Sequence, residues 1–144
     1  VDPKKNMTFN PKESIAFNGN TGPFIQYTYA RIRSIMRKAA EGKVAVPNEI
    51  QTTESLEHKE IQLLRLVEQF PEVVKEAGTE YSPAIIANFI YDLAKEYNQF
   101  YHELPIMFEE NEEKRAIRLL ISRITATIIK NGMWILGIKV PERM

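Results

Sequence analysis

Apolar residues recur every three or four positions through four long stretches of this chain, and strand-like alternation never persists beyond a few residues. The stretches cover about 23–40, 55–69 and 83–101, followed by a segment that begins near 109–113 and ends at 131–132. Because a helix that buries one face needs this spacing, each stretch predicts an amphipathic helix. We therefore expect an all-α fold, a helical bundle.

The expected core is one apolar stripe on each helix. In chain order its members are Ile25, Ile32, Ile35, Met36 and Ala39, then Ile61, Leu64 and Val67, then Ile86, Phe89, Ile90, Leu93, Tyr97 and Phe100, then Ile117, Leu120, Ile121, Ile124 and Ile128. With 44% hydrophobic residues, a chain of 144 residues can bury these stripes in a single domain.

Proline and glycine mark the expected helix ends. The start signals are Pro23 and the pair Ser82-Pro83, an N-cap followed by proline at the first helical position. The expected stops are Gly42, Pro71, Gly78 and Gly132. On this interpretation Pro71 breaks the second helix, and a separate short helix follows over 71–77.

The net charge of zero hides a segregation along the chain. Eight Lys/Arg and three Asp/Glu give residues 1–45 a charge of +5, four and fifteen give residues 46–113 a charge of −11, and seven and one give residues 114–144 a charge of +6. If the first and last blocks pack side by side, the molecule has a basic face suited to phosphates. Simple pairing of basic with acidic helices is the alternative explanation.

Residue types that break bonds or hold metals are sparse. The chain has no Cys, and His58 and His102 lie far apart without metal-ligand spacing. Gly19–Gly22 lacks the Gly-Lys-Ser/Thr ending of a phosphate-binding loop, and Glu109–Glu113 suit a helix start better than acid–base chemistry. We expect no catalytic residue, metal or cofactor within the chain. The longest apolar run, 133–138, is far shorter than the roughly 20 residues of a membrane span, so no membrane partner is expected.

The segment Gly19–Tyr27 predicts a sharp turn that opens directly into a basic helix. Tyr27, Arg31 and Lys38 share one face of that helix, three or four positions apart or two turns apart. Rings and cations on one element suit stacking on bases and pairing with phosphates. The segment therefore points to nucleic-acid binding.

Three motifs carry a resemblance to a known family. GNTGPFIQYTYAR at 19–31 is similar to the G-x-T-G-P-Y/F-x-Q-Y-x-x-x-R segment of arginyl-tRNA synthetases. RLL at 118–120, Gly132 and LGIKVPERM at 136–144 are similar to the closing R-L-x-L … G-x-x-x-L-G-I-x-x-P-x-R-M of that family. YNQFY at 97–101 resembles the intervening F/Y-N-x-F-Y segment. The matches come in the family's order and reach the last residue.

The resemblance implies a domain organisation and a parent activity. It implies the helical anticodon-binding domain of class I synthetases at residues 23–144, with the trailing edge of the catalytic domain at 1–22. It also implies a cytoplasmic parent that uses ATP to attach arginine to its tRNA, so the expected partners are arginine tRNA and the parent's own catalytic domain. The H-I-G-H-type and K-M-S-K-type signatures that handle ATP are absent, so this chain alone should not activate arginine. The first residue, Val1, fits a piece of a longer chain and equally a start left by tag removal or processing.

Seven residues are candidate contacts for tRNA. They are Tyr27, Arg31, Lys38, Tyr101, Arg118, Arg123 and Met144. The two tyrosines are candidates for base stacking and the cations for phosphate or base contacts, while the resemblance implies that Met144 lies near the anticodon loop. The alternatives are a core position for Tyr27 and solvated surface positions for the cations. Tyr97 lies on the apolar stripe and is expected in the core, and Tyr29 stands where many relatives carry His.

Two other functions stay open on the sequence. The chain fits a helical protein–protein interaction module whose acidic centre docks a partner, and it fits an intact small enzyme. Binding of tRNA that weakens steeply with salt distinguishes a tRNA-binding domain from a protein–protein interaction module. Arginine-dependent ATP–pyrophosphate exchange distinguishes an intact small enzyme from a domain that only binds tRNA.

Overall fold

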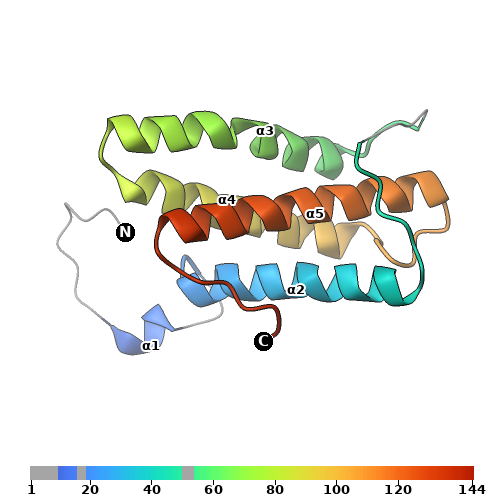
Figure 1. Ribbon diagram of the computed structural model, residues 1–144, viewed down its shortest axis with the longest axis horizontal. Coiled ribbons are helices and arrows are strands. Elements are labelled where there is room, and N and C mark those ends of the chain that lie inside the picture. Colours follow the sequence, from blue (N-terminus) through green and yellow to red (C-terminus); the bar gives the residue numbers. More distant parts are fainter. Residues whose placement is uncertain (1–9, 16–18, 50–53) are drawn as a thin grey trace.

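The computed structural model describes residues 10–15, 19–49 and 54–144 (Figure 1). Within these ranges the helices are α1 (Pro11–Ser14), α2 (Gly22–Glu41), α3 (His58–Thr79), α4 (Pro83–Glu103) and α5 (Glu112–Ile135), and no strand occurs. The prediction of an all-α bundle is confirmed.

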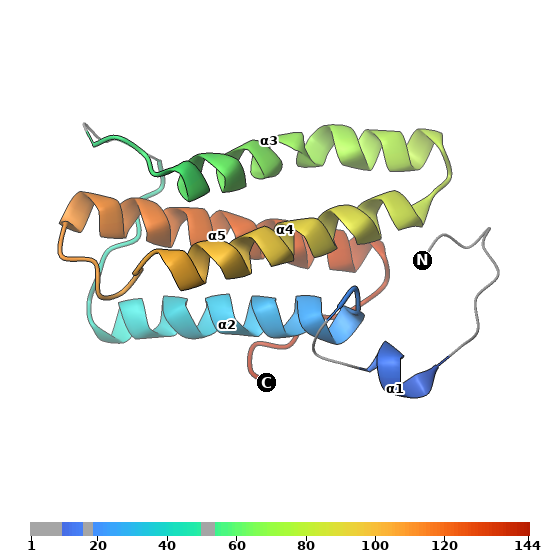
Figure 2. The same ribbon diagram turned by 180° about the vertical axis from the view of Figure 1, so that it is seen from behind.

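α4 and α5 form the centre of the bundle, with α2 on one side and α3 on the other (Figures 1 and 2). Both outer helices contact both central ones. The first and last basic helices, α2 and α5, are therefore neighbours, which meets the condition for the predicted basic face. After α5 the C-terminal tail turns back across α2, so the end of the chain lies beside that helix (Figure 1).

The core lies where the apolar stripes of the helices meet. The stripe predicted for α4 is buried throughout, and Tyr97 donates its hydroxyl hydrogen to Ser122 Oγ at 3.0 Å. Burial raises the pKa of Tyr97, so the phenol stays protonated. In α3 the predicted stripe is right at Leu64 and Val67, which pack against the core, and wrong at Ile61, which is exposed. Leu63, which the stripe left out, is fully enclosed. Glu60 occupies a core-facing position there, and this buried polar residue disrupts the apolar pattern.

The predicted helix break at Pro71 is also wrong. α3 continues through Pro71 to Thr79. Proline cannot donate the backbone hydrogen bond of a helix interior, so packing must hold the helix together at this point. The Phe70 ring stacks against Phe89 of α4 with 5.8 Å between ring centres, which supplies such packing directly beside the proline.

The sequence predicted that the last helix ends at Gly132, and this prediction is wrong. α5 runs on to Ile135, and the chain turns at Gly137, whose φ of +75° favours glycine. The reason for glycine at 132 is close packing between helices. A Cβ atom there would lie 2.4 Å from Cδ1 of Ile90 on α4.

Side-chain caps fix where α2 and α5 begin. Thr21 Oγ1 accepts a hydrogen bond from Phe24 N at 3.3 Å. Asn111 Oδ1 accepts from Glu113 N at 2.9 Å and Lys114 N at 3.1 Å. These bonds satisfy backbone donors that have no partner within the helix. α2 ends at Gly42, as predicted.

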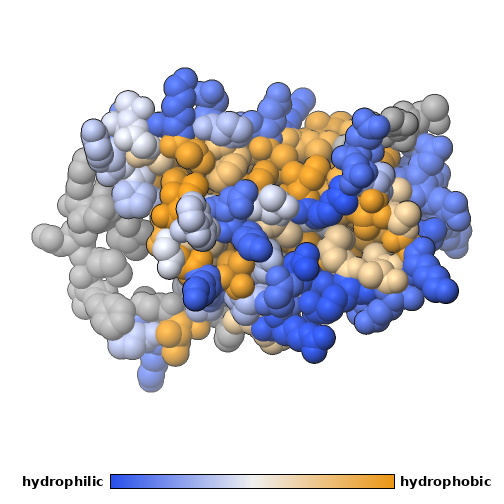
Figure 3. Space-filling model, in the orientation of Figure 1, coloured by the Kyte–Doolittle hydropathy of each residue, from blue (hydrophilic) through white to orange (hydrophobic). Residues whose placement is uncertain are grey.

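The surface is mixed in polarity. Apolar atoms gather over the middle of the face formed by α3 and α5, between polar edges (Figure 3). Near the end of α5, Trp134, Ile135 and Ile138 are exposed. Across the described ranges, no helix combines the length and apolar character needed to cross a bilayer.

Candidate nucleic-acid interface

Two tyrosine rings flank one arginine on the surface between α2 and α4. Tyr27 and Arg31 lie one turn apart on α2, and Tyr101 lies near the end of α4. Cζ of Arg31 is 4.9 Å from the ring centre of Tyr27 and 5.1 Å from that of Tyr101, both cation–π distances. The tyrosines are 42% and 38% exposed, so Tyr27 is not a core residue. The fold thus brings three of the sequence candidates together.

Asn98 fixes the orientation of this arginine. Nη1 of Arg31 donates a hydrogen bond to Oδ1 of Asn98. Nδ2 of Asn98 in turn donates to Thr28 Oγ1 at 2.8 Å and to the carbonyl of Ala94 at 3.0 Å. Asn98 was not among the predicted contacts, although it lies inside the YNQFY motif that carries the resemblance.

A hollow of about 400 Å³ opens beside the three stacked side chains. Its lining residues are Tyr27, Ala30, Arg31, Ser34, Arg37, Tyr101, Arg143 and Met144. Three of them are cations and none is acidic, so the hollow suits an anionic ligand. Aromatic faces, cations and a hydroxyl around one concave site are the groups that bind an unstacked base with its phosphate.

The C-terminal tail reaches the hollow by lying along α2. Nε2 of Gln26 donates to the carbonyl of Lys139 at 2.8 Å, and Nη1 of Arg37 donates to the carbonyl of Glu142 at 3.0 Å. Met144, two residues further on, lies beside the stacking residues.

The Glu142 carboxylate lies between two further side chains of α2. Oε1 accepts a hydrogen bond from the Tyr29 hydroxyl at 3.0 Å, and Oε2 accepts from Arg33 Nε at 2.6 Å. The hydrogen bond from Arg33 is the main cause that lowers the pKa of Glu142. Burial, and then the neighbouring Glu142, raise the pKa of Tyr29.

Lys38 lies on α2 at the edge of the same surface. It is exposed and lines a second hollow, of about 440 Å³, which shares Tyr101 with the first. Most of the other lining residues of this second hollow are apolar and come from the segment 104–108.

Arg123 of α5 holds the loop that follows α2. Its Nη2 donates to the carbonyl of Pro47 at 2.6 Å and to Asn48 Oδ1 at 3.3 Å. Arg123 also lines a small hollow together with Arg33 of α2 and Lys130 of α5. Cations of the two basic helices therefore do gather on one face.

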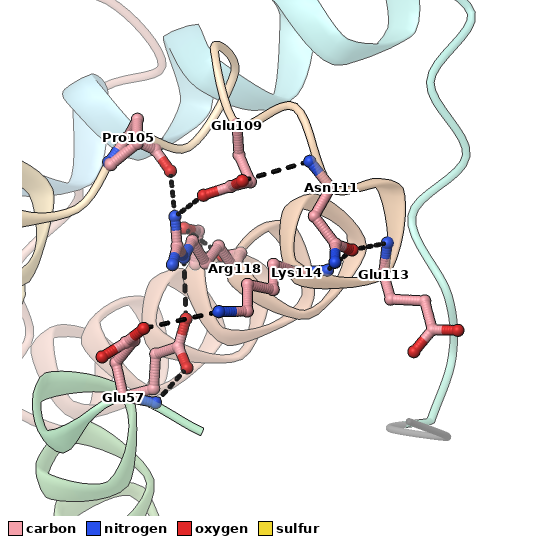
Figure 4. A network of polar contacts seen from close by, with 9 residues as sticks. Glu57, Pro105, Glu109, Asn111, Glu113, Lys114 and Arg118 are labelled. Atoms are coloured by element: carbon pink, nitrogen blue, oxygen red, sulfur yellow. Dashed lines mark hydrogen bonds and ion pairs between the residues drawn. The ribbon is translucent and has the colours of Figure 1, made fainter. Parts of the chain in front are cut away.

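Arg118 lies inside the protein, which corrects its assignment as a tRNA contact. Its side chain is 3% exposed. Nε donates to Glu60 Oε1 at 2.7 Å, and Nη1 donates to the carbonyl of Pro105 at 2.7 Å and to Glu109 (Figure 4). A guanidinium enclosed in this way is out of reach of RNA. Its acceptors come from α3 and from the α4–α5 loop, and sequence spacing does not reveal either.

The acidic segment before α5 is structural. Glu112 and Glu113 lie in the first turn, where the helix dipole favours anions. The backbone N–H of Asn111 and then Arg118 lower the pKa of Glu109, which keeps this carboxylate ionised. The described residues contain no cluster of His, Asp or Glu arranged to hold a metal.

The fold and the site together define a helical domain with a basic, aromatic surface. Residues 25–144 match the DALR anticodon binding domain, and the chain belongs to this family. The arginine–tRNA ligases of Parabacteroides distasonis and Bacteroides thetaiotaomicron are 60% and 58% identical to the chain over all 144 residues. The resemblance noted in the sequence is confirmed.

Solved structures agree with this placement. The arginyl-tRNA synthetase of Thermus thermophilus is 31% identical with a TM-score of 0.85, over 99% of this chain and 24% of that one. The arginyl-tRNA synthetase of Plasmodium falciparum is 25% identical with a TM-score of 0.80, over 100% of this chain and 25% of that one. The chain likewise spans 24% of the length of the two bacterial ligases.

Proposed function

We propose that this chain is the anticodon-arm recognition domain of an arginine–tRNA ligase. In this proposal an unstacked anticodon base enters the hollow bounded by Tyr27, Tyr101 and Met144. The observation that carries it is the placement of Arg31 between two exposed tyrosine rings beside that hollow. Each base–ring stack contributes about 1–3 kcal/mol, which is enough to hold a base outside the loop's own stack.

Phosphates of the anticodon arm bind to the cations around the hollow. Arg37 and Arg143 line it, and Lys38 stands at the edge of the neighbouring hollow. Arg33 and Arg123, with Lys130, provide a second group of cations on the α2–α5 face. Arg118 has no part in this, because it is buried.

The proposal extends to the full-length ligase of which this chain would be one part. Residues 23–144 are the tRNA-binding domain, and residues 1–22 are the trailing edge of the catalytic domain. The parent uses ATP to attach arginine in the cytoplasm, while this domain holds the anticodon arm so that the acceptor end reaches the catalytic domain. The ligases that are 60% and 58% identical to the chain support this assignment.

RNA binding by the chain tests the proposal. A hairpin RNA with an arginine anticodon loop is titrated by fluorescence anisotropy at several salt concentrations, beside a hairpin with the same stem and substituted anticodon bases. We expect the logarithm of the affinity to fall with the logarithm of salt concentration at a slope of about −2 or steeper, because several phosphates are neutralised. We also expect weaker binding of the substituted hairpin.

Binding that ignores both salt and anticodon sequence contradicts the proposal and favours the protein-interaction alternative. Arginine-dependent ATP–pyrophosphate exchange by this chain should be absent. Robust exchange would show that the chain is itself an enzyme.

A further inference from the structure

We infer that Glu142 is a positioning residue that fastens the C-terminal tail to α2, so that Arg143 and Met144 form a wall of the base-binding hollow. The inference rests on the proposed function for the identity of the ligand, an RNA loop. The fastening itself is a property of the protein alone and is tested separately below.

The contacts of Glu142 come from both its side chain and its backbone. The carboxylate accepts from Tyr29 at 3.0 Å and from Arg33 at 2.6 Å, and the carbonyl accepts from Arg37 at 3.0 Å. All three donors project from one stripe of α2, four positions apart. Gln26, one turn earlier on the same stripe, binds the carbonyl of Lys139. The tail is thus held at two points along α2.

The adjacent stripe of the same helix lines the hollow. Tyr27, Arg31 and Ser34 belong to it, and Arg37 takes part in both the fastening and the lining. A chain terminus without such contacts usually frays. Glu142 therefore determines whether the two residues that follow it stand at the hollow or move away from it.

The charge of Glu142 supports a positioning role. It is the only acidic residue between 114 and 144, on a surface where Arg33, Arg123 and Lys130 gather. A carboxylate beside bound RNA repels phosphate, so its plain electrostatic effect is to weaken binding. The hydrogen bonds from Tyr29 and Arg33 indicate that the carboxylate instead holds the tail against α2.

The two explanations predict opposite signs for Glu142→Gln. If Glu142 acts only as a charge, its removal strengthens RNA binding. If it fastens the tail, the variant loses the ion pair with Arg33 and keeps only the backbone contacts of Arg37 and Gln26. The tail end then leaves the hollow more often, and binding of the matching hairpin weakens about fivefold. Glu68→Gln, an exposed site on α3 at the far side of the bundle, is the matched control and should leave binding unchanged.

A truncation completes the test. A chain that ends at Glu142 lacks Arg143 and Met144, so the fastening no longer positions any residue at the hollow. Glu142→Gln should then cause no further loss and should show only the small strengthening expected from removing a negative charge. A merely structural role would instead produce the same loss in both backgrounds. The helical circular dichroism signal and melting temperature should stay unchanged in every variant, since the tail lies outside the helices.

The fastening is measured without RNA by the rate of carboxypeptidase release of Met144 and Arg143 and by the fast backbone motion of these two residues in NMR relaxation. The release rate should rise at least severalfold and the motion should increase in Glu142→Gln and in Arg33→Gln, and neither should change in Glu68→Gln. Equal release rates in Glu142→Gln and in the unsubstituted chain overturn the inference. RNA binding that is unchanged or tighter in Glu142→Gln of the untruncated 144-residue chain also overturns it. If the unsubstituted chain binds no RNA while release of the tail residues accelerates in Glu142→Gln and Arg33→Gln, the proposed function fails and the fastening stands.

Discussion

Glu60 and Arg118 form an ion pair inside the bundle, with Oε1 of the glutamate 2.7 Å from Nε of the arginine and side chains 2% and 3% exposed. The pair joins α3 to α5, and the same guanidinium binds Glu109 and the carbonyl of Pro105 in the α4–α5 loop. Both oxygens of Glu60 are used, because Oε2 accepts from the backbone N–H of Glu57 at the start of α3. One buried network therefore fixes a helix start, a helix pair and a loop.

Arg118→Ala should destabilise the fold by about 3–5 kcal/mol, because it leaves the Glu60 carboxylate buried without its partner. Urea denaturation followed by circular dichroism measures the change. Arg65→Ala, an exposed arginine on α3, is the control and should cost less than about 0.5 kcal/mol. A loss for Arg118→Ala as small as that of the control would show that the network contributes little.

Tyr27→Ala should weaken binding of the arginine anticodon hairpin about tenfold or more, since it removes one of the two rings beside Arg31. The same change in the full-length parent should lower aminoacylation efficiency. Helical content should stay intact, because Tyr27 is 42% exposed.

Tyr81→Ala is the matched control for that experiment. Tyr81 is 93% exposed in the turn between α3 and α4, away from the hollow. We expect no change in RNA affinity for this variant. A collapse of the circular dichroism signal in Tyr27→Ala, or equal effects of the two substitutions, would refute the stacking assignment.

The sequence predicted the fold because each helix carries its own apolar period. The stripe from Ile86 to Phe100 is buried as expected, and α2 ends at Gly42 as expected. Local signals failed where tertiary contacts decide the outcome. Pro71 predicts a helix break in the sequence, but the packing of Phe70 against Phe89 supports a continuous helix. Gly132 predicts a helix end, but the glycine is there because the Ile90 side chain occupies the space of a Cβ atom.

The candidate site was predictable only in part, for a similar reason. Tyr27 and Arg31 share a helix face, so periodicity alone places them together. Arg118 and Arg31 look alike in sequence, because nothing local reveals the buried acceptor at Glu60. Glu142 escaped notice because its partners lie more than 100 positions away in the chain, as the Arg33–Glu142 separation of 109 shows.

Gly132→Ala should destabilise the protein by about 1–3 kcal/mol, because the added methyl group meets Ile90 at 2.4 Å. Thermal melting measures the effect. Gly78→Ala is the control, since a Cβ atom there has nothing within 4 Å. The double variant Gly132→Ala with Ile90→Ala should lose less than the two single losses combined, because the shortened side chain makes room. Additive losses would show that the contact is not the cause.

Acid should release the C-terminal tail before the bundle unfolds. The pKa of Glu142 is lowered below its ordinary value of 4.5, first by the hydrogen bond from Arg33 and also by the Tyr29 hydroxyl and the charge of Lys130 on α5. Between the lowered and the ordinary value, the released tail binds more protons than the fastened one, so fastening strengthens as pH rises through this window. The contribution is complete above pH 4.5 and is lost as the pH falls through the lowered value. The methyl resonance of Met144 should therefore shift and sharpen only at pH below 4.5, and in Glu142→Gln it should look released at every pH. A transition with the same midpoint in that variant would assign the titration to another group.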